Sequence, residues 1–139
     1  MALVKSPALS EIWSVKILPA ENVEAAHFDL NRIKMFIGDD EQIINEVLDL
    51  TKIELSESAQ ALNSHFLNKD LKGLNLTGHK LYGTAVSSGL MVLSKMANQI
   101  EHMERFVEED ISDMLLKANA EMDLVVTLID KWKMNWKTE

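Results

Sequence analysis

The chain has 139 residues, of which 47% are hydrophobic and 26% are charged, and this balance is typical of one globular domain with a hydrophobic core. Its formal net charge of −8 argues against nucleic acid and anionic membranes as partners, because both bind basic surfaces. The sequence contains no cysteine, which excludes disulfides, thiol catalysis and thiolate metal sites. No apolar run approaches the ~20 residues of a membrane-spanning helix.

The first 27 residues differ in pattern from the rest of the chain. Both prolines, Pro7 and Pro19, lie here, and the hydrophobic periodicity is weak. We expect residues 1–27 to be a leader or linker with a short helix around residues 10–17, and residues 28–139 to form the folded domain. Charged residues interrupt the apolar stretch near the N-terminus, which argues against a signal peptide and makes a cytoplasmic protein the expectation.

From residue 29 onward, apolar residues recur every three or four positions, which is the pattern of amphipathic helices. The expected helices cover about residues 30–37, 40–66, 70–88, 93–107 and 110–136. Gly38 is expected to end the first of them. The expected capping residues are Asp39 or Asp40, then Asn68 or Asp70, then Asp110.

Four of these helices are long and have short connections, which an antiparallel bundle satisfies best. We therefore expect an all-α fold, an antiparallel up-down four-helix bundle with a short N-terminal helical extension. The methionines and the two tryptophans near the end of the last helix are expected to be core or bundle-end residues.

His79 lies in the middle of the predicted helix over residues 70–88, and Gly83 lies one turn further on. A glycine inside a helix costs about 1 kcal/mol relative to alanine, so its presence asks for a reason. One interpretation is clearance, because positions i and i+4 share a helical face and Gly83 leaves space beside the imidazole. The other is close packing of a neighbouring helix. The sequence leaves both open.

The periodicity of this helix predicts where His79 points. A core face is expected from Leu74, Gly78, Leu81 and Ala85. His79 precedes Leu81 by two residues, about 200° around the helix, so it is expected to face solvent. The residues that share its face are Asn75, Leu76, Tyr82, Gly83 and Val86. This partly apolar set is more typical of a docking surface than of a solvated face.

The pattern around His79 resembles that of the histidine-containing phosphotransfer (HPt) domains of two-component phosphorelays. In that pattern the histidine is followed by a leucine two residues on, a lysine three on, a glycine four on, small residues, and a second glycine ten on. The matching residues are His79, Leu81, Gly83, Thr84, Ala85 and Gly89, with Lys80 at a position that is also often lysine. Phe28-Asp29-Leu30, Ile37-Gly38-Asp39-Asp40 and Ile100-Glu101 are also similar to parts of such domains. The resemblance covers roughly residues 28–105.

The resemblance implies a phosphocarrier without kinase activity of its own. A response-regulator receiver domain, such as that of a hybrid sensor histidine kinase, would pass a phosphoryl group from its aspartate to His79, and His79 would pass it to another receiver. The chain has no nucleotide-binding P-loop, as expected for such a carrier. No cofactor is implied on this chain, and Mg²⁺ is expected on the receiver. The implied docking residues are Asn75, Leu76, Tyr82, Gly83 and Val86.

The chain departs from the family at Tyr82, which stands where the pattern has a lysine that is thought to steady the phosphoryl group. Its duty could pass to Lys80 or Lys72, or the tyrosine hydroxyl could donate a hydrogen bond. The expected phosphate-supporting residues are therefore Lys80, Tyr82 and Gly83. Tyr82 also leaves open an alternative, an interaction module of the HPt fold without phosphotransfer activity.

A metal site is not expected in this sequence. The four histidines do not pair with one another at a spacing of three or four residues, and no E-x-x-H motif appears on an expected helix. The acidic residues lie mostly at predicted helix starts and on outer faces, where solvated caps are the simpler interpretation.

Overall fold

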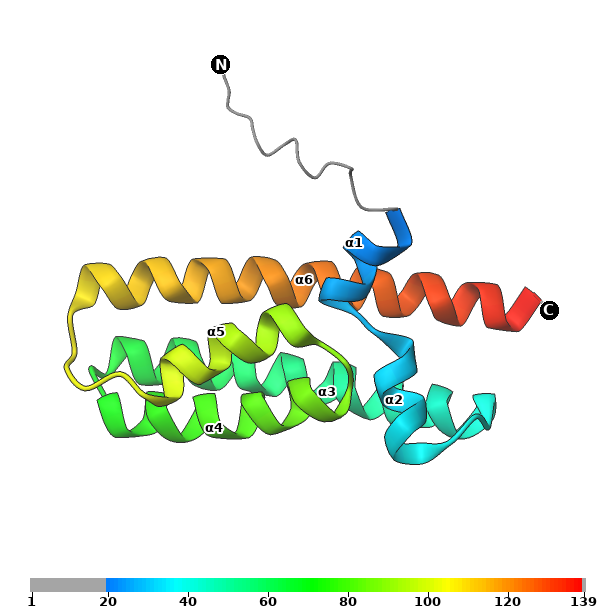
Figure 1. Ribbon diagram of the computed structural model, residues 1–139. Coiled ribbons are helices and arrows are strands. Elements are labelled where there is room, and N and C mark those ends of the chain that lie inside the picture. Colours follow the sequence, from blue (N-terminus) through cyan, green and yellow to red (C-terminus); the bar gives the residue numbers. More distant parts are fainter. Residues whose placement is uncertain (1–19, 139) are drawn as a thin grey trace, which may run out of the picture.

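The computed structural model describes residues 20–138, with side chains described for residues 24–135. Within this part the chain forms six α-helices and no strand, so the predicted all-α class is confirmed. The helices are α1 (Ala20–His27), α2 (Leu30–Ile37), α3 (Glu41–Leu67), α4 (Leu71–Ser87), α5 (Met91–Glu101) and α6 (Glu108–Thr138), shown in Figure 1. Across the described residues, no helix is both long and apolar enough to cross a membrane. The short helix expected around residues 10–17 lies outside the described residues.

Capping side chains begin three of the helices, two of them at predicted positions. Asp29 accepts a hydrogen bond from the Asn31 backbone N–H at the start of α2. Asp40, and not Asp39, accepts from the N–H groups of Gln42 and Ile43 at the start of α3. Asp70 likewise accepts from Gly73 at the start of α4. Each carboxylate satisfies backbone donors that the first turn leaves without a partner.

The Asp40 cap gives the first testable prediction. Asp40→Ala removes the acceptor for two backbone N–H groups, and we expect it to lower the free energy of unfolding by about 1 kcal/mol. Urea unfolding followed by circular dichroism measures this change. Asp39→Ala is the matched control and should leave the midpoint unchanged. Equal losses in both variants would contradict the assignment of the cap to Asp40.

Two predicted boundaries at the end of the chain are wrong. The helix expected to run to residue 107 ends at Glu101, and the connection to α6 contains Met103 and Val107. Met103 packs against the core from this connection, whereas Val107 is exposed. The regular spacing of these two apolar residues therefore does not indicate a helix here.

The start of α6 also differs from the prediction. The helix begins at Glu108, so Asp110 lies in its first turn with Glu108 and Glu109 and does not precede it as a cap. Three negative charges in a first turn interact favourably with the positive end of the helix dipole.

The four longest helices pack around a shared hydrophobic core. Helix α3 contacts α4 and α6, and α5 contacts the same two helices. Figure 1 shows α3, α4 and α6 extended along the length of the molecule. The main core includes Leu55, Leu62, Leu74, Leu81, Leu93, Ile100, Ile111 and Val125. A second cluster, formed by Ile33, Ile44, Leu48 and Ile129, anchors α2 to α3 and α6.

Helix α1 lies inside the segment predicted to be a leader or linker, and it contacts α5 and α6. The His27 Nδ1 lies 2.6 Å from the Glu121 Oε2 of α6, and the Glu121 side chain is buried. A buried carboxylate is costly unless it is paired, so this contact fixes the end of α1 against α6. The division of the chain at residue 27 stays a prediction.

Gly89 makes the turn that brings α5 back along α4. Its φ of +73° lies in the left-handed region that favours glycine. The Asp29 N–H donates to the Gly89 carbonyl at 2.8 Å, and a Cβ at residue 89 would collide with the Asp29 backbone. Gly89 therefore follows the end of α4 and also makes a close contact with the start of α2.

Candidate functional site

Helix α4 presents His79 to solvent, as predicted. The predicted core face is confirmed, because Leu74, Gly78, Leu81 and Ala85 are all buried. His79 lies on the other side of the helix, with 72% of its side chain exposed. A phosphoryl donor bound to another protein could therefore reach the ring from solvent.

Glu101, at the end of α5, holds the His79 ring. The His79 Nδ1 lies 2.7 Å from the Glu101 Oε2. The two helices run in opposite directions, because Asn75 contacts the Ile100 and Met103 carbonyls while Gly78 faces Ala97 and Glu101. This packing places the carboxylate beside the imidazole, with only 23% of the Glu101 side chain exposed.

The Glu101 contact decides which ring nitrogen of His79 is free. An ionised carboxylate only accepts hydrogen bonds, so the proton of a neutral His79 ring lies on Nδ1. The Nε2 atom then carries the lone pair. Because the ring is largely exposed, this lone pair is available to an electrophile, and the arrangement is that of an oriented nucleophile.

The structure distinguishes the two interpretations of Gly83, and Gly78 on the same helix is the comparison. A Cβ at Gly78 would lie 2.7 Å from the Glu101 backbone nitrogen and 3.0 Å from the Ala97 carbonyl oxygen, so Gly78 allows α5 to pack closely. A Cβ at Gly83 would have no neighbouring atom within 4 Å. Gly83 therefore has no packing reason, and the clearance interpretation is favoured.

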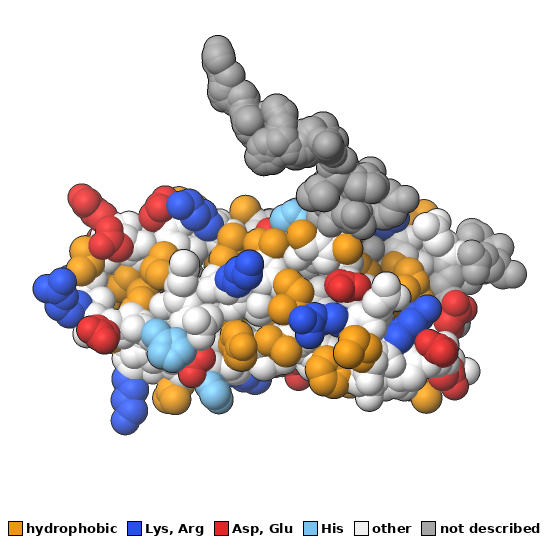
Figure 2. Space-filling model, in the orientation of Figure 1, with side chains coloured by type: hydrophobic (Ala, Val, Ile, Leu, Met, Phe, Trp, Pro, Cys, Tyr) orange, Lys and Arg blue, Asp and Glu red, His pale blue; other side chains and the backbone are white. Residues whose placement is uncertain are grey.

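The surface around His79 is partly apolar. Leu76 is 62% exposed, Tyr82 is 39% exposed, and Val86 is half-buried. Figure 2 shows histidine side chains at the surface over the α4 and α5 side of the molecule, with hydrophobic side chains close by. Exposed large apolar side chains beside an exposed imidazole suit the face of a partner domain.

The Asn75 amide makes hydrogen bonds within the protein. Its Nδ2 donates to the Ile100 carbonyl at 2.9 Å and to the Met103 carbonyl at 3.2 Å, and the side chain is half-buried. These carbonyls belong to the end of α5, where helical partners are lacking. Asn75 thus ties α5 to α4 next to Glu101, and its role in docking stays a prediction.

Three lysines lie near the His79 surface in sequence or in space. Lys80 and Lys72 are exposed on α4, and Lys95 is exposed on α5. Within the described part of the chain, none of the three forms an ion pair or a side-chain hydrogen bond. Their positive charges are therefore available to an anionic group.

Glu101 is the residue of the candidate site whose contact the sequence does not predict. The HPt-like pattern includes it in the Ile100-Glu101 pair and gives it no role. Helical spacing relates residues three or four apart and carries no signal for a contact between residues 79 and 101. The pattern match was the one indication in the sequence.

The Glu101 contact gives a second testable prediction. Glu101→Leu removes the acceptor that orients the ring, and we expect the His79 ring to react with a phosphoryl donor roughly 10- to 100-fold more slowly, because misplaced reacting groups lose rate to this extent. Glu101→Gln is the matched control, because its amide oxygen still accepts from Nδ1, and it should retain most of the rate. The measurement is the initial rate at which radiolabelled phosphate is transferred from a phosphoryl donor to the protein. Equal rates in Glu101→Leu and the wild type would contradict an orienting role.

Among residues 24–135, no group of three or more histidine, aspartate or glutamate side chains is placed to hold a metal ion. Comparison of the chain with protein-family models, with curated proteins and with solved structures gives no match. The functional assignment therefore depends on the geometry around His79 and on the sequence pattern that surrounds it.

Proposed function

We propose that this protein is a histidine phosphotransfer domain that relays a phosphoryl group between receiver-domain aspartates through His79. One observation carries the proposal: an exposed histidine has its Nδ1 held by a carboxylate, and the next turn of its helix is an uncrowded glycine. The HPt-like sequence pattern falls on these same residues. The proposal includes the finer fold of that family, in which α3, α4, α5 and α6 form an antiparallel four-helix bundle.

The proposed reaction is a displacement at phosphorus. The Nε2 lone pair of His79 attacks the phosphorus of an aspartyl phosphate, and the N–P bond forms while the P–O bond to the aspartate breaks. The aspartate carboxylate leaves with the electron pair of that bond. The ring becomes positively charged and keeps its Nδ1 proton, which faces the Glu101 carboxylate. Transfer to the next receiver is the reverse of this step.

Little further catalytic apparatus is needed on this side of the reaction. Phosphoryl transfer is accelerated mainly by positioning and by electrostatic stabilisation of the transferring group. In the proposed relay, the Mg²⁺ and lysine of the receiver supply most of the stabilisation. This protein supplies an oriented nitrogen, the open space over Gly83, and an apolar rim that includes Leu76 and Tyr82.

The proposal names the partners by their chemistry. They are receiver domains that carry a phosphorylated aspartate, including that of a hybrid sensor histidine kinase. A cytoplasmic location is part of the proposal, because the relays that the sequence resembles operate there.

The test is transfer of radiolabel from a panel of phosphorylated receiver domains to the purified wild-type protein. Transfer from at least one receiver is expected, and the label on this protein should survive base and be lost in acid, as for phosphohistidine. Absence of label with every receiver, while one of them still binds, would overturn the proposal in favour of an interaction module of the same fold. An acid-stable label would also contradict it.

A further inference from the structure

We infer that Lys95, on α5, supplies the positive charge beside phosphorylated His79 that the chain lacks at position 82. The inference depends on the proposed function and adds a residue to it. The HPt pattern has a lysine three residues after the histidine, and here that position is Tyr82. The sequence leaves open whether Lys80, Lys72 or the Tyr82 hydroxyl takes over the role of that lysine.

Lys95 lies on the same side of α4 as the His79 contact. Tyr82 lines an open hollow between α4 and α5, and Lys95 lines the same hollow together with Met91, Ser94, Asn98 and Gln99. The ring of His79 also turns toward α5, where it meets Glu101. A lysine at position 82 would lie at the edge of this hollow, on α4. Lys95 lines the same hollow from α5.

Lys80 lies on the side of α4 that faces away from α5. Residues 80 and 84 share a helical face because they are four apart. Thr84 Oγ1 donates to Glu54 Oε1 at 3.0 Å, and Glu54 belongs to α3. The stem of Lys80 therefore leaves the helix near α3, whereas the His79 ring leans toward α5.

A cation on the α5 side of His79 would offset the negative charges that gather there on phosphorylation. A phosphoryl group on Nε2 would place negative charge on one side of a ring whose other nitrogen lies 2.7 Å from the Glu101 carboxylate. The two negative groups would repel each other across the ring, and a flexible ammonium near the phosphoryl group offsets that repulsion. Lys95 is exposed, and within residues 24–135 its ammonium forms no ion pair with another side chain.

The experiment uses the full chain, phosphorylated with phosphoramidate so that no receiver contact affects the result. Phosphorylated Lys95→Met is expected to lose its phosphoryl group several-fold faster than the wild type. A ³¹P titration should show the phosphoryl group of this variant titrating at higher pH, because a nearby cation favours its dianion. Lys80→Met is the matched control and should behave as the wild type.

Two further variants test whether Lys95 acts through its positive charge or through a structural role. Lys95→Arg keeps the charge and should retain most of the stability of the phosphorylated form. Tyr82→Lys added to Lys95→Met restores a cation at the rim of the hollow and should rescue that stability. A merely structural role for Lys95 would not produce this rescue or the shifted titration.

The inference is overturned if Lys95→Met matches the wild type in both measurements, or if Lys80→Met shows the losses in its place. Failure of the proposed function gives a different result. Phosphoramidate phosphorylates an exposed imidazole without any partner, so His79 would still be labelled and the Lys95→Met comparison could still be made, but no phosphorylated receiver would transfer its phosphoryl group to wild-type His79.

Discussion

Replacement of His79 by glutamine should reduce transfer from phosphorylated receivers to background while leaving the helical fold intact. Glutamine can still contact Glu101 through its amide, but it has no nucleophilic ring nitrogen, so no N–P bond can form. The side chain is 72% exposed, and substitutions at such positions usually change the free energy of unfolding by less than about 0.5 kcal/mol. Transfer of radiolabel from phosphorylated receivers and a urea unfolding curve should both be measured on the same preparation. Together they show whether a variant has lost phosphoryl transfer or has lost its fold.

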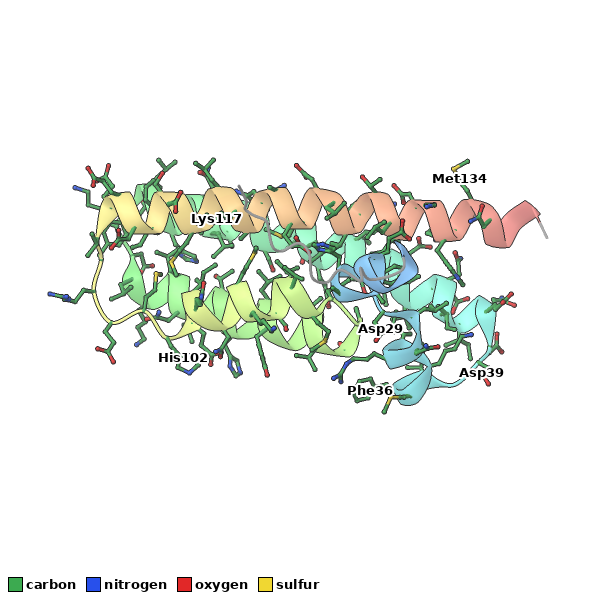
Figure 3. The ribbon with its side chains drawn as sticks, turned by 45° about the horizontal axis from the view of Figure 1, so that its top comes forward. Asp29, Phe36, Asp39, His102, Lys117 and Met134 are labelled. Atoms are coloured by element: carbon green, nitrogen blue, oxygen red, sulfur yellow. The ribbon has the colours of Figure 1, made fainter. Side chains whose placement is uncertain are left out.

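His102→Gln is the matched control for this variant. His102 is a second exposed histidine, and it lies at the end of α5, next in sequence to Glu101 (Figure 3). Its Nδ1 lies 2.9 Å from the Asn98 carbonyl oxygen, so the ring faces a neutral carbonyl and not a carboxylate, and His102 lies outside the HPt-like pattern around His79. We expect the His102→Gln protein to accept label at the wild-type rate. Labelling that survives in His79→Gln, or that disappears in His102→Gln, would place the phosphorylated group elsewhere.

The same glycine-to-alanine change should have opposite effects at two positions of α4. Gly78→Ala puts a methyl group 2.7 Å from the Glu101 backbone nitrogen, and we expect it to lower the free energy of unfolding by roughly 1–3 kcal/mol. Gly83→Ala meets no atom within 4 Å, so the better helix propensity of alanine should raise that free energy by roughly 0.5–1 kcal/mol.

Urea unfolding of the two alanine variants, with the wild type beside them, measures both effects. Each variant is a control for the other, because the chemical change and the helix are the same. If Gly83→Ala proved as destabilising as Gly78→Ala, then Gly83 would have a packing role. That result would contradict the interpretation that Gly83 leaves open space beside the His79 ring.

Much of the helical framework could be predicted from the sequence because its signals are local. Gly38 ends α2 with a positive φ that suits glycine, and the Asp40 and Asp70 carboxylates cap the starts of α3 and α4. The orientation of His79 followed from its angular position relative to Leu81 on a single helix. Such inferences need only helical geometry and capping rules.

The rest of the site depends on contacts between helices, which local patterns do not report. The apolar stripe through Met103 predicted a longer α5, although that residue packs against the core from a connection. The sequence places Gly78 on the core face and Gly83 on the face of His79, but only the position of α5 shows that a Cβ would collide at Gly78 and would meet no atom at Gly83. The contacts of Glu101 with His79 and of Asn75 with the end of α5 are set by that same packing.

The most direct test of the site is to locate the phosphorus–nitrogen bond in the phosphorylated wild-type protein. Labelling the histidines with ¹⁵N and recording ³¹P–¹⁵N couplings by NMR identifies both the residue and the ring nitrogen. A single bond to Nε2 of His79 is expected, because Glu101 engages Nδ1. Attachment at Nδ1 of His79, at another histidine, or at a carboxylate would contradict the role given to this pair.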